Sequence, residues 1–160
     1  MAENQSGTAK ASELQIVVCE LGDERYGLDI AHVYEIIRMQ PITSVPRSPQ
    51  FVKGVINLRG RIIPVVDLRE RFGMTASDAT KATRIVVAET SGTRVGLVVD
   101  GVSEVLMVPT DAIEATPVVA AGADTGYLRG IANLGERLII LLGLDGLFGA
   151  EERAALAAAA

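Results

Sequence analysis

Side chains that could carry out chemistry are few in this sequence, and they stand apart from one another. Histidine occurs once, as His32, and cysteine occurs once, as Cys19 inside the apolar run LQIVVCEL. A thiol in such a run is typical of a buried, inert cysteine, and these two residues do not make a nucleophilic pair. The sequence also lacks clustered metal ligands, a phosphate-binding glycine loop and a nucleophile elbow. It therefore predicts no enzymatic activity, no metal and no cofactor.

One charged residue is a candidate for binding a partner. Arg59 and Gly60 separate two apolar runs in FVKGVINLRGRIIPVVDLRERFG, residues 51–73. The pair has the pattern of a tight two-residue turn between strands, in which glycine supplies a positive φ. The Arg59 side chain should then project from a hairpin tip, where its planar guanidinium can bind a carboxylate or backbone carbonyls. A solvated turn residue is the alternative on these residues alone.

The elements that would hold this arginine occur twice in the chain. Residues 14–37 align with residues 83–106 without a gap, and residues 51–73 align with residues 127–149. A repeat of this kind predicts two similar structural halves. The identical pairs include Ile16/Ile85, Gly27/Gly96, Val33/Val102, Glu35/Glu104, Gly54/Gly130, Asn57/Asn133 and Arg61/Arg137.

The second copy keeps the hairpin but not its tip arginine. Gly135 and Glu136 stand where Arg59 and Gly60 stand in the first copy. A side chain that one copy lacks is not needed for the turn to fold, which favours a binding role for Arg59. Glu35, by contrast, has an equivalent in the second copy, Glu104. We expect Glu35 near the start of a short helical turn, where a carboxylate can satisfy backbone donors.

Each half has the pattern of several short strands followed by a hairpin. Polar turns separate the strands, and segments 31–39 and 100–108 are ambiguous between helix and strand. Strands at this spacing predict an all-β fold with short helices, in which two five-stranded barrels pack on a shared hydrophobic core. We place the halves at about residues 14–73 and 83–149.

Glycine and proline restrict the backbone at particular points of these halves. Gly27, Gly96 and Gly130 are predicted to serve the structure, at points where strands approach closely or bulge. Pro64 cannot donate to a β-ladder, so its strand should lie at an edge or bulge there.

Composition excludes several classes of function. The chain of 160 residues is 49% apolar and 22% charged, as globular proteins are, and its formal net charge is −5. The acidic balance and the absence of Trp argue against nucleic-acid binding. No apolar run reaches the ~20 residues that span a bilayer, and the N-terminus lacks a secretory signal. We therefore expect a cytoplasmic protein without membrane insertion, with tails at residues 1–12 and 150–160.

Four segments together resemble one known family. YGLDIAHVYEII, FVKGVINLRGRIIPVVDLR, GLVVDGVSEVL and YLRGIANLGERLIILL are similar, in this order, to signature segments of the bacterial chemotaxis coupling proteins, the CheW family. The likeness covers about residues 13–149. It implies two SH3-like five-stranded barrels that share a hydrophobic core, and a stand-alone, non-enzymatic adaptor.

The resemblance also implies partners and a binding site. Proteins of this family hold the cytoplasmic hairpin tips of chemoreceptors (methyl-accepting chemotaxis proteins) and the regulatory domain of the histidine kinase CheA in one array. Receptor binding is attributed to a groove between the barrels, and kinase binding to an apolar strand surface. The positions that match the receptor site are Val33, Glu35, Gly54, Asn57, Arg59 and Gly60.

Other functions stay open at this point. A similar adaptor could serve a non-flagellar receptor–kinase pathway, such as surface motility or development, because the motif residues do not separate these pathways. A small barrel could also bind an oligonucleotide or a small ligand, although the acidic charge counts against the first of these. An unrecognised enzyme is the remaining alternative.

Overall fold

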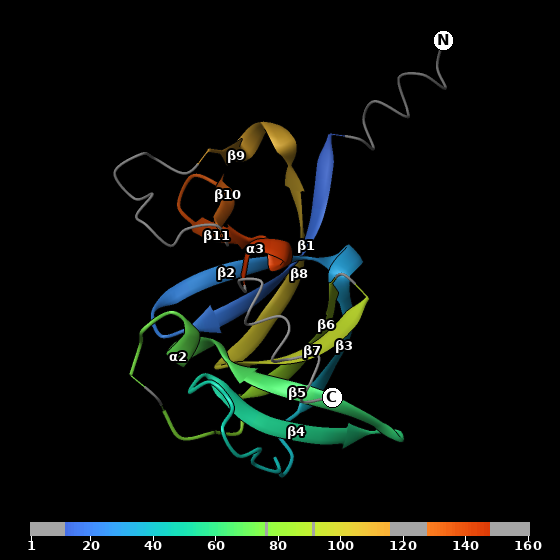
Figure 1. Ribbon diagram of the computed structural model, residues 1–160. Coiled ribbons are helices and arrows are strands. Elements are labelled where there is room, and N and C mark those ends of the chain that lie inside the picture. Colours follow the sequence, from blue (N-terminus) through green and yellow to red (C-terminus); the bar gives the residue numbers. More distant parts are fainter. Residues whose placement is uncertain (1–11, 76, 91, 116–127, 148–160) are drawn as a thin grey trace.

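Strands dominate the computed structural model of the chain (Figure 1). The structure describes residues 12–75, 77–90, 92–115 and 128–147, so the predicted tails lie outside it, apart from Ser12. In chain order the elements are β1 (Glu13–Leu21), β2 (Glu24–Asp29), the 3-10 turn η1 (Ile30–His32), β3 (Val33–Arg38), β4 (Val52–Leu58), β5 (Arg61–Asp67), α2 (Leu68–Arg71), β6 (Arg84–Thr90), β7 (Thr93–Val99), β8 (Gly101–Pro109), the 3-10 turn η2 (Thr110–Ala112), β9 (Ile113–Glu114), β10 (Leu128–Asn133), β11 (Leu138–Leu142) and α3 (Leu144–Leu147).

The strands form two sheets, one above the other in Figure 1. The upper sheet makes barrel A and has the order β8-β1-β2-β11-β10-β9, whereas the lower sheet makes barrel B and has the order β3-β6-β7-β5-β4. Each sheet contains one parallel pair, β2 with β11 and β5 with β7. Barrel A has a sixth strand because β9, only two residues long, pairs with β10.

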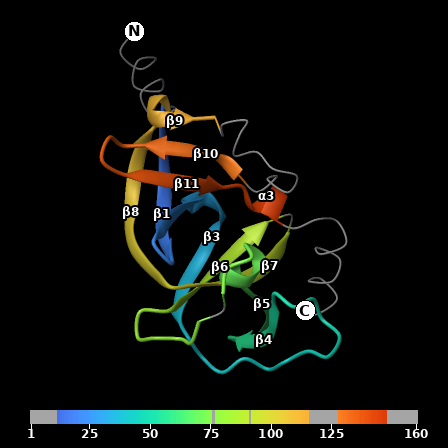
Figure 2. The same ribbon diagram turned by 90° about the vertical axis from the view of Figure 1, so that its left-hand side faces the viewer.

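Each barrel takes strands from both halves of the repeat. In barrel A, β1 pairs with β8 and β2 pairs with β11. In barrel B, β3 pairs with β6 and β5 pairs with β7. The chain thus leaves barrel A after η1 to form β3, and it leaves barrel B after β7 to form β8 (Figure 2). The two halves interleave, and a boundary between halves is not a boundary between barrels.

The apolar residues form three layers through the molecule. One layer fills barrel A, a second fills barrel B, and the largest, which we call the junction core, lies between them. Strand β1 supplies Ile16 and Val18 to barrel A and Val17 and Cys19 to the junction core. Both of its faces are therefore covered, which explains a continuous apolar run without alternation. From the other barrel, the junction core receives Val66, Val86, Ala88, Val95, Leu97 and Val99.

Three glycines lie where the structure leaves no room for a side chain. A Cβ at Gly27 would lie 2.8 Å from Cδ1 of Ile16, and a Cβ at Gly96 would lie 2.8 Å from Cγ2 of Ile85. These two contacts are equivalent in the repeat, one in each barrel. At Gly130 a Cβ would lie 2.9 Å from the backbone oxygen of Glu114. This packing favours a structural role for the three glycines, which stays a prediction.

Both ambiguous segments are mainly strand. The prediction that Glu35 lies in a short helical turn is wrong: η1 ends at His32, and Glu35 belongs to β3. The residues next to Glu35 are β-branched or aromatic, and such residues favour a strand. This strand, β3, pairs with β6 and forms one edge of the sheet of barrel B. At Pro64 the structure agrees with expectation, because β5 pairs with β7 only from Val65 onward.

Candidate functional site

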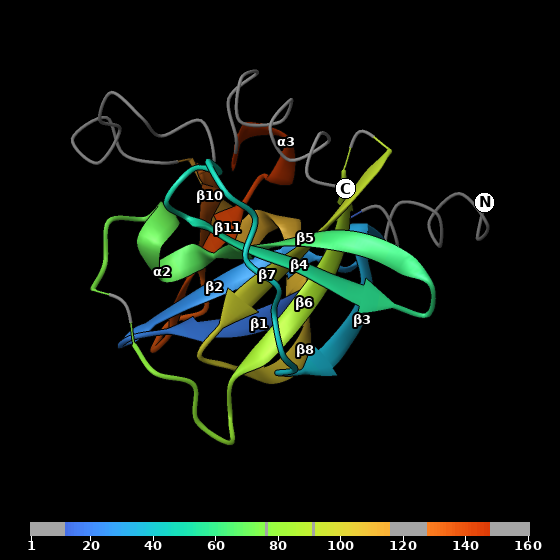
Figure 3. The same ribbon diagram turned by 60° about the horizontal axis from the view of Figure 1, so that its bottom comes forward.

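Arg59 and Gly60 form the tip of the β4–β5 hairpin (Figure 3). Their φ angles are 52° and 86°, both positive, as a type I′ hairpin turn requires. The Asn57 side chain closes this turn, because its Oδ1 accepts a hydrogen bond from the Gly60 backbone N at 2.8 Å. In the second hairpin Asn133 Oδ1 also accepts a hydrogen bond from a turn glycine, from Gly135 N at 3.1 Å, one position earlier in the turn. The asparagine shared by the two copies therefore serves the turns.

The Arg59 side chain is not free at the tip but binds Glu35 on β3. Its two amino groups donate to the two carboxylate oxygens, each at 2.5 Å, and we call this ion pair the first clasp. β3 and the β4–β5 hairpin lie at opposite edges of the sheet (Figure 3). The clasp therefore ties these edges together. The hydrogen bonds from Arg59 hold the pKa of Glu35 below its usual range, so the pair stays ionised at neutral pH. The Arg59 side chain remains 68% exposed.

Barrel A has a corresponding ion pair, the second clasp, between Arg137 and Glu104. The Arg137 guanidinium donates to the Glu104 carboxylate at 2.7 Å. Glu104 is equivalent to Glu35 in the repeat, but Arg137 is equivalent to Arg61 and not to Arg59. Arg61 itself is exposed and has no side-chain hydrogen bond or ion pair within the described chain. The two barrels thus use arginines two positions apart, and only barrel B places the arginine in the turn.

Sequence reasoning missed the second clasp, because a repeat aligns residues but does not state which of them bind each other. The repeat alignment matched both Glu104 and Arg137 with residues of the first half. Those residues are Glu35 and Arg61, and Arg61 makes no ion pair within the described chain, so the alignment points to no pairing in the second half either. The first clasp joins two residues of the predicted receptor site, Glu35 and Arg59, which lie 24 residues apart in the chain.

Exposed apolar side chains lie on two edge strands beside the junction core. They are Tyr34 and Ile36 on β3 and Val105 and Met107 on β8, each between 38% and 51% exposed. Ile36 is the cross-strand partner of a junction-core residue of β6, and Val105 is the partner of one of β1. Cross-strand partners share a face of the sheet. Both strands therefore expose apolar surface toward the junction of the barrels. We call this surface the junction groove, after the groove between the barrels that the family resemblance implies.

The aromatic residue of this groove is held by an arginine. The Arg94 guanidinium lies over the Tyr34 ring, 3.7 Å from its centroid, and its Nε donates to Glu89 at 3.2 Å. A cation over an aromatic face is attracted to it, so this contact orients the ring while half of the ring stays exposed.

Two of the predicted receptor-site residues lie largely inside the fold. Val33 begins β3 opposite Ala88 and packs against the junction core. Gly54 is buried at φ 145°, and a Cβ there would lie 2.0 Å from the carbonyl oxygen of Thr43. That carbonyl accepts a hydrogen bond from Val55 N at 2.8 Å, which brings the chain after β3 against β4. Gly54 thus permits barrel B to close, and any effect of this residue on binding would act through the fold.

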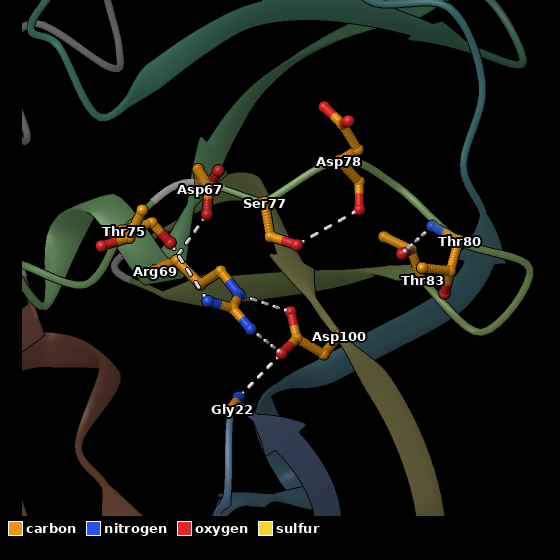
Figure 4. Close-up of polar contacts among 9 residues, drawn as sticks. All are labelled: Gly22, Asp67, Arg69, Thr75, Ser77, Asp78, Thr80, Thr83 and Asp100. Carbon is orange, nitrogen blue, oxygen red and sulfur yellow. Dashed lines mark hydrogen bonds and ion pairs between the residues drawn. The ribbon is translucent and has the colours of Figure 1, made fainter.

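A polar cluster that sequence reasoning missed joins the two barrels. The Asp100 carboxylate accepts hydrogen bonds from Nε and Nη2 of Arg69, at 2.8 and 2.6 Å, and from the backbone N of Gly22 at 2.7 Å (Figure 4). Gly22 is in the β1–β2 turn of barrel A, whereas Arg69 is in α2, directly after β5 of barrel B. The bonds from Arg69 lower the pKa of Asp100, so the cluster is ionised at neutral pH. No motif spacing connects these three positions.

A cavity of about 190 Å³ adjoins this cluster. Asp67 faces it and is only 7% exposed, and its Oδ1 accepts a hydrogen bond from Arg69 N at the start of α2. Burial raises the pKa of Asp67. The other charged residues of the cavity have partners, since Lys53 binds Glu70 and Arg69 binds Asp100. We interpret this cluster as a structural connection between the barrels.

The groups that could do chemistry are inert or isolated in the part of the chain that the structure describes. Cys19 is buried, and burial raises its pKa to about 12, so the thiol stays protonated. His32 is exposed in η1. Across these residues no three His, Cys, Asp or Glu side chains come together as metal ligands would. Among the described helices, none has the length and apolar character needed to cross a bilayer.

Comparison with known proteins places this geometry in one family. The family model described as CheW-like domain matches residues 15–152. A relative named chemotaxis protein CheW, from Klebsiella aerogenes, is 39% identical over 88% of this chain and 84% of its own. Protein FrzA of Myxococcus xanthus is 30% identical over 82% of each chain. The crystal structure of the scaffolding protein TtCheW from Thermoanaerobacter tengcongensis superimposes with a TM-score of 0.80, at 41% identity, covering 87% of this chain and 94% of that one. This likeness confirms the expected fold, two SH3-like barrels on a shared core.

Proposed function

The chain belongs to the CheW family of chemotaxis adaptor proteins, and we propose that it joins the hairpin tips of chemoreceptors to the regulatory domain of the histidine kinase CheA. The observation that carries the receptor part of this proposal is the position of Arg59. It is an exposed, oriented cation on a rigid hairpin, tied to β3, the strand that carries one wall of the junction groove.

The junction groove suits a helical partner. A receptor tip is a hairpin of helices, and a helix can lay an apolar face against exposed side chains of two strands while Arg59 meets a carboxylate or helix-terminal carbonyls. The first clasp supports this role because it holds the guanidinium in place before binding. A side chain that is already ordered loses less entropy when a partner arrives.

We assign direct receptor contact to Arg59, Gly60 and Glu35 and indirect roles to the other predicted residues. Asn57 shapes the turn that presents Arg59, Gly54 allows the barrel to close, and Val33 anchors β3 on the junction core. Loss of any of these three side-chain or backbone features would weaken binding by moving Arg59 or the groove.

The kinase contact is proposed for apolar strand surface outside the groove. Ile62 on β5 and Leu138 on β11 are 45% and 61% exposed, and they occupy equivalent positions of the two hairpins. Surface of this kind favours a protein partner over solvent. An adaptor with separate surfaces for receptor and kinase needs no chemistry of its own, because it acts by raising the effective concentration of one partner near the other.

The same proposal gives the protein a cytoplasmic location, where receptor tips and kinase would recruit it to membrane-associated arrays. A non-enzymatic role is supported by the protonated thiol of Cys19 and by the isolated position of His32. An adaptor of a non-flagellar receptor–kinase pathway is the second candidate. The relatives named for chemotaxis reach higher identity, 39% against 30% for FrzA, which favours the chemotaxis function.

We predict that Arg59→Ala weakens binding to a receptor cytoplasmic fragment about thirtyfold, equivalent to about 2 kcal/mol. The reason is that the exposed guanidinium would lie at the centre of the contact. Isothermal titration with the purified fragment measures this loss, and kinase binding by the same variant should be unchanged.

The matched control is Glu136→Ala at the tip of the second hairpin, where we expect little change in receptor affinity. Near-unchanged binding by Arg59→Ala would remove Arg59 from the site. If the wild-type chain captured neither a receptor nor a histidine kinase from lysate, the coupling role itself would fail.

A further inference from the structure

A basic pocket lies where the end of β3 meets the loop that leads into β6. A cavity of about 470 Å³ is lined by Arg38, Met39, Thr80, Lys81, Thr83 and Arg84. Three of these six residues are cationic and none is acidic, although the whole chain has a formal net charge of −5. Figures 2 and 3 both show the end of β3 beside this loop. The pocket is thus locally positive, although the chain as a whole is negatively charged.

The two arginines of this basic pocket are direct cross-strand partners. Arg38 on β3 pairs with Arg84 on β6. Like charges placed opposite each other destabilise a sheet. Barrel A has the same strand pair at the equivalent position, and there Met107 on β8 lies opposite Gln15 on β1. The fold therefore does not require an arginine at either position. Because the Arg38–Arg84 pair costs stability, we look for its explanation in binding.

No carboxylate neutralises this charge within the described chain. The Arg84 guanidinium donates to two backbone carbonyls, of Lys81 at 2.7 Å and of Thr83 at 2.9 Å. The side chains of Arg38 and Lys81 are exposed and make no hydrogen bond or ion pair there. Asp100, an acidic residue of the adjoining cavity, is already bound by Arg69.

Two threonine hydroxyls of the pocket add neutral donors. Thr83 Oγ1 accepts a hydrogen bond from Thr80 N at 2.8 Å (Figure 4). Thr80 Oγ1 accepts one from Ala82 N at 3.1 Å. Each hydroxyl is used as an acceptor, so its proton is left to donate. Thr83 is only 7% exposed and lines the pocket. The pocket therefore offers charged and neutral donors together.

We propose that the basic pocket binds a phosphate group. The charge of a single carboxylate is balanced by one arginine in these contacts, as Glu35 is paired with Arg59 and Asp100 with Arg69. Two guanidinium groups, an ammonium and two hydroxyls exceed what a carboxylate can accept, but they match the oxygens of a phosphate dianion. This assignment does not depend on the coupling function, since none of these residues belongs to the junction groove or the first clasp.

The proposal is tested by titrating the full-length protein with inorganic phosphate at constant ionic strength and following backbone amide resonances by NMR. We expect saturable shifts confined to residues 38–39 and 80–84. Parallel titrations use ADP, sodium acetate and a poly-glutamate peptide. Tighter binding of ADP than of phosphate supports the site and assigns it to a nucleotide, whereas binding of phosphate at least as tight supports a free ion. Equal binding of acetate, or binding of poly-glutamate alone, overturns the phosphate assignment.

The decisive variant copies barrel A into barrel B, as Arg38→Met combined with Arg84→Gln. It should bind phosphate at least tenfold more weakly, because two charged donors are lost. Arg61→Gln is the matched control, since Arg61 is an exposed arginine of the same barrel that lies outside the pocket. The phosphate affinity of this variant should equal that of the wild type. Thermal unfolding checks that each variant is folded. If the double variant does not fold, the single variant Arg38→Met takes its place in the titration. Absence of saturable shifts in the wild type, or unchanged affinity of the folded variant, would refute the proposal.

Discussion

At the scale of single residues, Arg59 combines an unfavourable backbone conformation with a favourable side-chain contact. Its φ of 52° lies in the left-handed region, which costs a residue with a side chain about 1 kcal/mol. The same residue forms the first clasp with Glu35. Barrel A avoids this strain, because there Gly135 takes the positive φ and the clasp arginine stands after the turn. The strained position in barrel B is what places the guanidinium at the hairpin tip.

A pair of substitutions separates this strain from the loss of the side chain. Arg59→Gly and Arg59→Ala both remove the clasp and the proposed receptor contact, but only glycine adopts the positive φ without penalty. We expect the glycine variant to have a free energy of unfolding about 1 kcal/mol higher than the alanine variant. Urea denaturation of both measures this difference. Equal stability would mean that the turn changes its conformation when Arg59 is replaced.

At the level of elements, each hairpin closes its barrel at a glycine beside a β-bulge. Register shifts occur between Val52 and Gly54 in β4 and between Leu128 and Gly130 in β10. At both glycines a backbone carbonyl of the preceding segment approaches closely, that of Thr43 at the first. The bulge bends the strand and the glycine admits the carbonyl, so the two features together let a short sheet turn back on itself.

Gly54→Ala should therefore destabilise the protein by about 3 kcal/mol, because the new Cβ meets a backbone atom that cannot move aside. Gly60→Ala is the matched control. Its φ of 86° is also positive, but no atom lies within 4 Å of a Cβ there, and we expect a loss of only about 1 kcal/mol. Thermal or urea unfolding compares the two. Similar losses at both positions would show that backbone conformation, and not close contact, sets the cost at Gly54.

The strands could be predicted from sequence, but their partners could not. The internal repeat and the turn residues identify β1, β2, β4 and β5 and their counterparts, and the equivalence of Asn57 and Asn133 separates turn-forming residues from Arg59. A repeat states that two segments are alike, however, and is silent on which copy each strand pairs with. Segments 31–39 and 100–108 were ambiguous for the same reason, because their strand state depends on a partner from the other half.

For the whole molecule, interleaving makes the two barrels one folding unit. Strand β3 connects the first half to β6, and β8 connects the second half to β1, so neither barrel is complete within one half. The junction core, the largest apolar cluster, is also shared between both sheets. The cluster around Asp100 adds polar contacts across the same junction. Unfolding should therefore be a single cooperative transition, since no half can lose its structure alone.

Expression of the halves as separate fragments tests this interdependence. A fragment of residues 13–73 keeps the hairpins β1–β2 and β4–β5 but loses β6, β7, β8 and β11, and isolated hairpins are marginally stable in water. We expect this fragment and the fragment of residues 83–147 each to show poorly dispersed amide NMR spectra. Mixed in equal amounts, they should form one complex with dispersed resonances, because every cross-half strand pair can form between chains. A cooperative unfolding transition in either fragment alone would show that one half is stable without the other, and would contradict this prediction.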